Sequence, residues 1–440
     1  MRSLKMLTLL GKEGRELLAS RSYWFLLLLI GPLVGHDFVT ALVLYGEASG
    51  SGVRPAALPQ GLSPLDGILV PTLGAYYIAV TLLFPFVAIR LVSNEKETGA
   101  VKLAAQFPVG MGANIAAKVV VLLAGWAVAW VPGVIAIVSW RFCGGHLQAP
   151  ETLNLVFGHL LHMLLASGVA VAAAAIAESA ASAAIVTLGF TLGTWALDFI
   201  AAGRGGWIGE LAAYTPTAAL RGFEQGVLGL SSVVVISALS LGGFVLAAIW
   251  MHPGRSWRRR GLLTAATVLG LGLAVIGGAI LRPSWDLSED RRNSFPQADE
   301  MALGQIRNSL RVTVHLSPED PRLMDLQRNV LAKLERILPR VEVQYSAGSV
   351  TGLFEGGGDQ YGEVWYEIAG RRAMTRSTVE PIVLEQIYQL ADVNPPEHSS
   401  ENGYPGYPLA VNSSAFGWTY YGGWPLTIIL AAVIYRKARR

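Results

Sequence analysis

Four charged residues lie close together between two long apolar runs of the sequence. They are Glu95, Lys96, Glu97 and Lys102. In a helix, Glu95 and Lys102 share one face, whereas Gly99 and the Phe107-Pro108 pair are expected to interrupt the helix. The pattern predicts a charged helical segment, a turn, and a second helix that returns to the apolar region. Such a segment is either a docking site for another protein or a solvated connector.

Ionisable residues also occur near the ends of apolar runs. His36 and Asp37 fall in the first run, and Asp198 falls in the fifth. Because a charged group in lipid is costly unless it is paired, each of these side chains is a candidate for a substrate route. The alternative is that they are exposed at the membrane interface or make structural hydrogen bonds.

The chain lacks the sequence signatures of an enzyme. It contains no GxxxxGK[ST] phosphate-binding motif, and its single cysteine, Cys143, excludes an intrachain disulfide and a multi-cysteine metal site. Six ionisable residues near two loops have no metal-site spacing and are better explained as charged loops that lead into helices: Asp286, Glu289, Asp290, His315, Glu319 and Asp320. We expect no catalysis by this chain alone, and no bound metal or cofactor.

Composition indicates a membrane protein. Of the 440 residues, 52% are hydrophobic and 15% are charged, whereas soluble domains have about 25% charged residues. A helix needs about 20 apolar residues to span a bilayer. Eight runs meet that length: 23–45, 68–91, 116–139, 155–176, 180–202, 228–250, 261–281 and 418–435. The first run is longer than a signal-peptide core, so we expect it to be an uncleaved span.

Lysine and arginine are distributed unevenly among the loops. Four segments that would share one side are rich in these residues: 1–22, 90–118, 251–260 and 436–440. The positive-inside rule therefore predicts that both termini are cytoplasmic. The basic excess is explained by topology, and no nucleic-acid partner is expected. The long polar segment 282–417 is then extracytoplasmic.

Segment 282–417 has the alternation typical of an α/β domain. Strands are expected at 311–317 and 341–346, a hairpin that turns near Gly370 at 362–374, and helices at 320–338 and 379–391. The loop 351–360 is rich in glycine. This order predicts a thioredoxin-like or related sheet that lacks the CxxC motif, and hence a binding or docking module for an extracytoplasmic protein.

The charged segment carries a family resemblance. Arg90, Glu95-Lys96-Glu97-x-Gly99, Gln106-Phe107-Pro108-Val109 and Lys118 resemble the coupling segment of type 2 ABC exporter permeases. The family pattern is close to E-x-x-x-G-T-x-x-L-L-x-x-P, and this chain differs at Ala100 and Leu103-Ala104. Lys12-Glu13 and Glu16 resemble its N-terminal interfacial helix.

The resemblance implies that these elements dock on two copies of a separate ATP-binding subunit, which holds ATP and Mg, beside a second permease copy or paralogue. It also implies a bacterial inner-membrane location. Region 203–232 resembles the outer re-entrant helices of the family, so Tyr214 and Glu224 join the candidates for the exit gate.

A second resemblance concerns the start of the polar segment. Residues 285–295, WDLSEDRRNSF, resemble the opening of the auxiliary domain of gliding-motility-type ABC transporters. The implied division is a six-span core (1–260) with coupling segment 90–118, a seventh span (261–281), a shortened extracytoplasmic domain (282–417), and a last span with a basic tail (418–440).

Three functions remain open from the sequence. The chain is an exporter permease, or it passes ATPase-driven motion to an envelope partner of gliding or pilus type without transporting a substrate, or it is a membrane anchor or receptor that has no ATPase.

Overall fold

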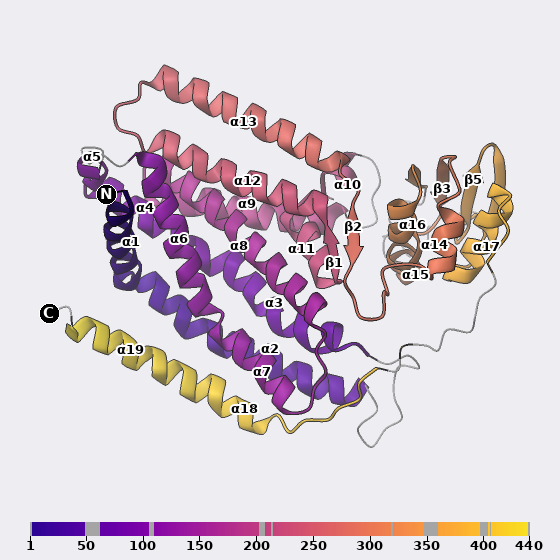
Figure 1. Ribbon diagram of the computed structural model, residues 1–440, viewed down its shortest axis with the longest axis horizontal. Helices are drawn as coiled ribbons and strands as arrows, with labels where there is room; N and C mark the ends of the chain where they lie inside the picture. The colour runs from indigo at the N-terminus through magenta and orange to yellow at the C-terminus, as the bar shows by residue number, and fades with distance from the viewer. Residues whose placement is uncertain are drawn as a thin grey trace, which may run out of the picture. The chain divides into compact units, whose positions relative to one another are not determined.

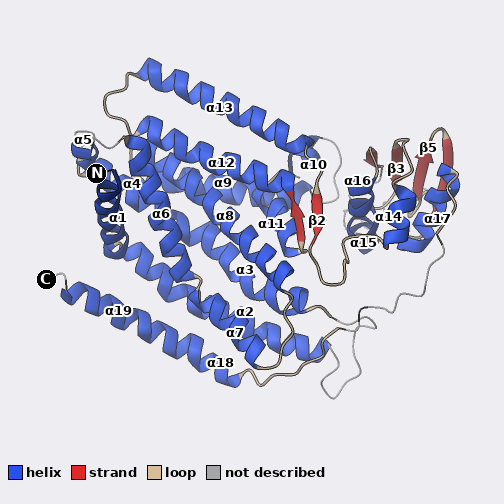
Figure 2. Cartoon of the chain, in the orientation of Figure 1, coloured by secondary structure: helices blue, strands red, loops and turns tan. Residues whose placement is uncertain are grey.

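The computed structural model is mostly helical (Figure 2). It describes residues 2–48, 62–104, 110–201, 207–212, 214–317, 320–346, 360–396, 404 and 406–438. The chain divides into two compact units. Unit 1 comprises residues 1–193, 230–281 and 404–440, and unit 2 comprises residues 194–229 and 282–403.

Among the described residues, seven helices are long and apolar enough to cross a membrane. They are α2 (Arg21–Ala48), Leu65–Glu97, Met111–Phe142, α8 (Ala149–Ile176), α9 (Ala180–Ala201), α12 (Leu230–Trp250) and α13 (Trp257–Ile280). These helices correspond in order to the first seven apolar runs predicted from the sequence, and each helix contains most of its run. The chain is therefore a multi-pass membrane protein with a helical membrane domain.

The eighth expected span, 418–435, is helical but does not reach the apolarity of the other seven. It consists of α18 (Ser414–Trp418), a π-helical turn (Thr419–Gly423) and α19 (Trp424–Ala438). Its first half carries Thr, Tyr, Gly and Pro. The segment packs on α2, where the Trp424 and Tyr420 rings fill the space left by Gly31 and Gly35.

Prolines divide the second and third spans into shorter helices. The second span contains a π-helical turn (Leu65–Leu69), α3 (Val70–Ile78), another π-helical turn (Ala79–Leu83) and α4 (Phe84–Glu97). The third contains α6 (Met111–Ala129) and α7 (Val131–Phe142). Pro71, Pro85 and Pro132 stand in the first turns of α3, α4 and α7. Because proline has no N–H, the backbone regularity changes at these points.

The closest helix packing in unit 1 joins α8 to α12, and α13 runs beside α12 (Figure 1). A Cβ atom on Gly243 would lie 2.5 Å from the Gly168 carbonyl oxygen, and one on Gly168 would lie 2.7 Å from the Ser240 carbonyl oxygen. Small residues thus allow the two backbones to touch, as in other membrane helix pairs. Gly168 lies in a run of mostly small residues, 166–184, that continues from α8 into α9.

Two short helices complete unit 1. Helix α1 (Arg2–Ala19) precedes the first span and packs against α6 and α4. Helix α5 (Ala100–Ala104) follows α4 after the turn at Gly99, whose φ of 71° favours glycine.

Unit 2 contains a four-stranded sheet in the order β4-β3-β5-β6. Strands β3 (Leu310–Val314) and β4 (Val341–Tyr345) are parallel, and β5 (Val364–Ile368) is antiparallel to both β3 and β6 (Arg371–Thr375). Ala369 and Gly370 both have positive φ in the tight hairpin turn. The expected order of strand, helix, strand, hairpin and helix is observed.

Apolar residues of β3 and β5 form a core with the helices between residues 297 and 391. These helices are α14 (Gln297–Leu303), α15 (Pro321–Leu326), α16 (Ala332–Ile337) and α17 (Glu380–Ala391), with a π-helical turn at Gln327–Leu331. The expected loop 351–360 falls almost entirely outside the described residues.

A second, two-stranded sheet links distant parts of unit 2. Strand β1 (Val227–Gly229) follows α10 (Trp207–Ala212) and α11 (Pro216–Glu224), and it pairs antiparallel with β2 (Ser284–Asp286). The side chain of Asn293 adds a hydrogen bond of 2.7 Å to the Gln225 carbonyl oxygen.

Candidate functional site

A buried lysine joins three elements of unit 1. Lys118, on α6, lies 2.6 Å from Glu13 Oε2 on α1 and 3.1 Å from Glu95 Oε2 on α4. It also donates a hydrogen bond of 3.0 Å to the Leu91 carbonyl oxygen. The side chains of Lys118 and Glu13 are fully buried, and that of Glu95 is 1% exposed. The ammonium group therefore connects α1 with the ends of the second and third spans.

Lys12 and Glu16 extend this cluster toward the surface. Lys12 is ion-paired with Glu95, lies 3.1 Å from Glu13 Oε1, and lies 3.5 Å from Glu16 Oε1. Partial burial acts to lower the pKa of Lys12, but the hydrogen bond to Glu95 and the charge of Glu13 outweigh it and raise the pKa. Burial raises the pKa of Glu13, although Lys118 opposes the shift.

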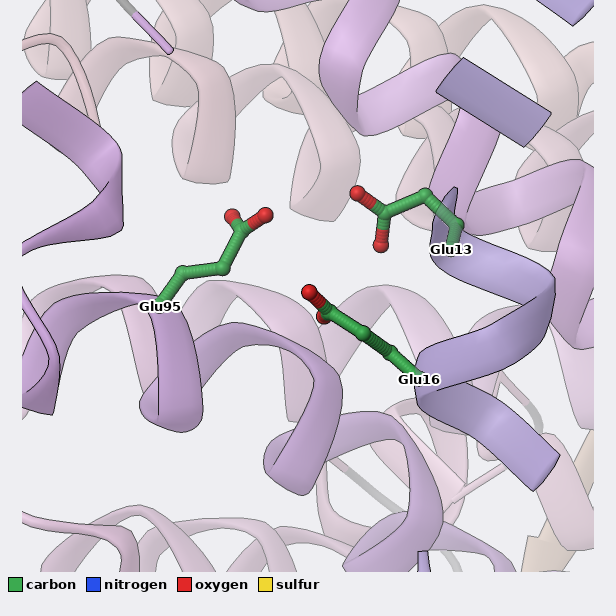
Figure 3. Close-up of side chains that lie close together, drawn as sticks. All are labelled: Glu13, Glu16 and Glu95. Atoms are coloured by element: carbon green, nitrogen blue, oxygen red, sulfur yellow. The ribbon is translucent and has the colours of Figure 1, made fainter. Parts of the chain in front are cut away.

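The three carboxylates point toward one another, Glu13 and Glu16 from α1 and Glu95 from the opposite helix (Figure 3). One oxygen from each lies within 4.8 Å of the others, a separation that a metal ion could bridge. Lys12 and Lys118 already supply two positive charges to these three carboxylates. The donor set therefore fits an internal ion-pair network better than a metal site.

The remaining residues of the predicted docking segment have different environments. Lys96 is half-buried. Its Nζ donates hydrogen bonds of 2.6–3.1 Å to the carbonyl oxygens of Ala174, Ala175 and Ala177. It thus caps the carboxyl end of α8. Glu97 and Lys102 are exposed on either side of Gly99. Phe107 and Pro108 lie outside the described residues.

The candidates for a substrate route lie in both units. In unit 1, His36 is exposed and Asp37 is half-buried on α2. In unit 2, Asp198 forms an ion pair of 2.6 Å with Arg221, which the sequence did not single out. Tyr214 is 45% exposed, and burial raises the pKa of Glu224, with Arg221 acting in the opposite direction.

Two histidines that the sequence interpretation missed lie inside unit 1. His159 and His162, on α8, are buried, and none of their ring nitrogens has a hydrogen-bond partner within the described residues. They contact aromatic rings, His159 those of Tyr76 and Trp130, and His162 that of Tyr77. The sequence pattern that could have indicated them is a pair of histidines three positions apart within an apolar run.

The acidic residues of the unit 2 loops have structural roles. Asp286 accepts hydrogen bonds from the Asn293 backbone N–H at 3.0 Å and the Ser294 hydroxyl at 2.9 Å. Asp320 is the N-cap of α15 and accepts from the Arg322 backbone N–H at 3.0 Å. Asp320 thus leads into a helix, as expected from the sequence, whereas Asp286 is the last residue of strand β2. Glu319 lies outside the described residues.

The best-defined site of unit 1 is therefore the ion-pair cluster of Lys12, Glu13, Glu16, Glu95 and Lys118, from here called the charge cluster. It is followed in the chain by the turn of residues 97–102, in which Glu97, Thr98 and Lys102 are exposed. Comparison of the chain with protein-family models, with curated proteins and with solved structures finds no match.

Proposed function

We propose that the chain is the membrane subunit of an ABC exporter in a bacterial inner membrane, with both termini in the cytoplasm. Two copies of a separate ATP-binding subunit would hold ATP and Mg, and a second permease copy or paralogue would complete the path. The observation that carries the proposal is the charge cluster beside the exposed turn 97–102.

The charge cluster supports this function for a mechanical reason. Force applied by an ATP-binding subunit has to reach the spans without being lost in a loose loop. Lys118, Glu13 and Glu95 connect α1 to α4 and α6 through fully buried ion pairs, and such pairs are costly to separate. A push on the exposed turn would therefore move two spans and the N-terminal helix together.

The docking contact itself belongs to the exposed residues of this region. Glu97 and Lys102 are available to a partner, whereas Glu95 is 1% exposed and is held by two lysines. We assign the docking role to Glu97 and Lys102. We assign a second role, keeping α1, α4 and α6 rigidly connected, to Glu95, Lys12, Glu13 and Glu16. Lys96 holds the end of α8 next to the turn.

A specific observation favours the second candidate, transmission of motion to an envelope partner. Strand β1 leads directly into span α12, and it pairs with β2 at the start of the polar segment. We place that segment outside the membrane as a thioredoxin-like or related domain, which its strand order and directions support. Motion of the gate helices α10 and α11 would then reach this domain through the backbone.

Copurification tests the proposed function. The chain is expressed with its neighbouring reading frames, and the purified assembly is assayed for an ATP-binding subunit and for ATP hydrolysis. The double charge reversal Glu97→Lys with Lys102→Glu should release that subunit.

Arg258→Glu, a reversal at an exposed residue of another basic segment, is the control and should leave the assembly intact. A purified assembly that contains no nucleotide hydrolase would overturn the proposal and leave a membrane anchor or receptor as the remaining function.

A further inference from the structure

A cavity of about 470 Å³ lies between α1 and α4 in unit 1. It is lined by Lys12, Arg15, Glu16, Ala19, Ser20, Arg90, Leu91 and Asn94. Three of these side chains are cationic and one is anionic. The cavity touches the charge cluster at Lys12 and Glu16 but extends beyond it to residues that the proposed function does not use.

Two of the cations are free to bind an anion. Lys12 already contacts Glu13, Glu16 and Glu95. Arg15 and Arg90 are exposed and form no ion pair with any carboxylate in the described part of the chain. Glu16 is the one acidic group in the lining, and Lys12 lies 3.5 Å from it. The cavity therefore has a positive balance provided by two guanidinium groups that have no carboxylate partner among the described residues, although Arg15 Nε donates a hydrogen bond of 3.0 Å to the Gly11 carbonyl oxygen.

The lining also contains a buried hydroxyl that has no hydrogen-bond partner among the described residues, and a side-chain amide. The Ser20 side chain is buried, with 7% of the residue exposed, and its hydroxyl has no partner among the described residues. Asn94 adds an amide to the same lining. Buried hydroxyls in folded proteins usually have a hydrogen-bond partner, so the Ser20 hydroxyl is available to donate to a group bound in the cavity.

The position of the cavity identifies the source of the anion. Ser20 separates α1 from the first span, which begins at Arg21, and Arg90 and Asn94 lie in the last two turns of the second span, which ends at Glu97. Both points are span ends, where the hydrocarbon region gives way to lipid headgroups. Guanidinium groups bind phosphate oxygens in a bidentate manner.

We propose that this cavity binds the phosphate of an anionic phospholipid headgroup, with Arg15 and Arg90 as the charged ligands and Ser20 as a hydrogen-bond donor. The lipid would fill the space between the N-terminal helix and the second span, and so hold α1 at the membrane surface. The proposal requires only a membrane protein and does not depend on the ABC exporter assignment.

Lipid binding to the purified full-length protein tests the site. The delipidated protein in neutral detergent is titrated with phosphatidylglycerol, and the first bound lipid is counted by native mass spectrometry. Each charge-assisted phosphate contact contributes about tenfold to affinity. The double variant Arg15→Gln with Arg90→Gln should therefore lose at least about tenfold in apparent affinity.

The matched control is Arg258→Gln with Arg259→Gln, which removes two exposed arginines from another basic segment. Only the general attraction of anionic lipid to a basic surface should change in this variant, so its affinity should stay within about threefold of the original. Equal losses in the two double variants would overturn the site. If the first double variant does not fold, the single variant Arg90→Gln is used, with an expected loss of about tenfold.

Competition distinguishes the two sources of phosphate. Inorganic phosphate and glycerol 1-phosphate lack acyl chains, so at equal concentrations they should not displace the bound phosphatidylglycerol. Displacement by either at concentrations comparable to the lipid would overturn the lipid assignment and identify the cavity as a site for soluble phosphate. Phosphatidylcholine, which has no net charge, should bind more weakly than phosphatidylglycerol.

Discussion

Lys118 pairs with two buried carboxylates, those of Glu13 and Glu95. In Lys118→Met the side chain keeps a similar length but loses its charge, and Glu13 and Glu95 are left with Lys12 as their cation. Because a buried charge without its partner is strongly unfavourable, we expect a loss of about 3–5 kcal/mol of stability. The measurement is the thermal unfolding midpoint of the purified protein.

The control for this variant is Lys102→Met, which removes an exposed lysine from the neighbouring helix α5 and should leave the midpoint unchanged. Adding Glu13→Gln to Lys118→Met removes one of the stranded charges and should recover part of the loss. An unchanged midpoint in Lys118→Met would show that the buried ion pair does not hold α1 to the spans.

Asp320 provides a pH-dependent contribution in unit 2. Hydrogen bonds from Arg322, together with one from Tyr361, hold the pKa of Asp320 at about 2 against the opposing effect of burial. The pKa in an unfolded chain is about 3.9. Ionised Asp320 therefore stabilises the folded unit above about pH 4, and this contribution is lost as the pH falls from about 4 to about 2.

Asp320→Asn should remove that pH dependence. Hydrogen exchange of the amides in α15, corrected for the intrinsic effect of pH, should accelerate below pH 4 in the original chain. In the variant it should be fast at pH 6 already and change little on acidification. Asp325→Asn, at an exposed position in the same helix, is the control. Parallel pH profiles for Asp320→Asn and the original chain would contradict the capping role.

At the scale of elements, the α8–α12 contact leaves no room for a side chain. Gly243→Ala would place a Cβ 2.5 Å from the Gly168 carbonyl oxygen, and backbone atoms cannot give way cheaply. We expect a destabilisation of about 1–3 kcal/mol from overpacking, measured as a lower unfolding midpoint. Gly270→Ala is the matched control, because a Cβ there meets nothing within 4 Å. Equal midpoints for the two variants would show that the helices separate without cost.

Elements whose signals are local could be predicted from the sequence. Each of the seven spans combines length with apolarity, and the hairpin at Gly370 has a turn that only a few residue types favour. The end of the chain was harder to predict. A helix is expected there, but its packing brings Trp424 and Tyr420 against Gly31 and Gly35, which lie some 390 positions away, and no local pattern reports such a fit.

The candidate site also combines a local signal, which the sequence shows, with long-range contacts, which it does not. The charged run containing Glu95 is visible in the sequence, but the partner of Glu13 lies 105 positions further on. Residues of the same type in one sequence segment can also differ in burial. Glu95 and Glu97 are two positions apart, yet one lies inside the charge cluster and the other is exposed.

At the scale of the whole molecule, unit 2 combines two segments that are distant in the sequence. The segment before span α12 and the segment after span α13 meet in the β1–β2 pair, and Asn293 bonds across them to Gln225. If ATPase-driven motion passes outward, this link has to carry it into the four-stranded sheet. A device that only exports a substrate does not need the sheet to respond to nucleotide.

Asn293→Ala tests the transmission of motion in the complete assembly with the ATP-binding subunit. If the proposed transmission operates, trapping with ATP and vanadate should alter hydrogen exchange in β3 and β5 of the original chain, because the sheet would follow helices α10 and α11. The variant should show a smaller change, since it lacks the side-chain bond of 2.7 Å between the two segments. Asn308→Ala, at an exposed position, should respond like the original chain. A sheet whose exchange ignores nucleotide in the original chain would contradict transmission and leave export as the function.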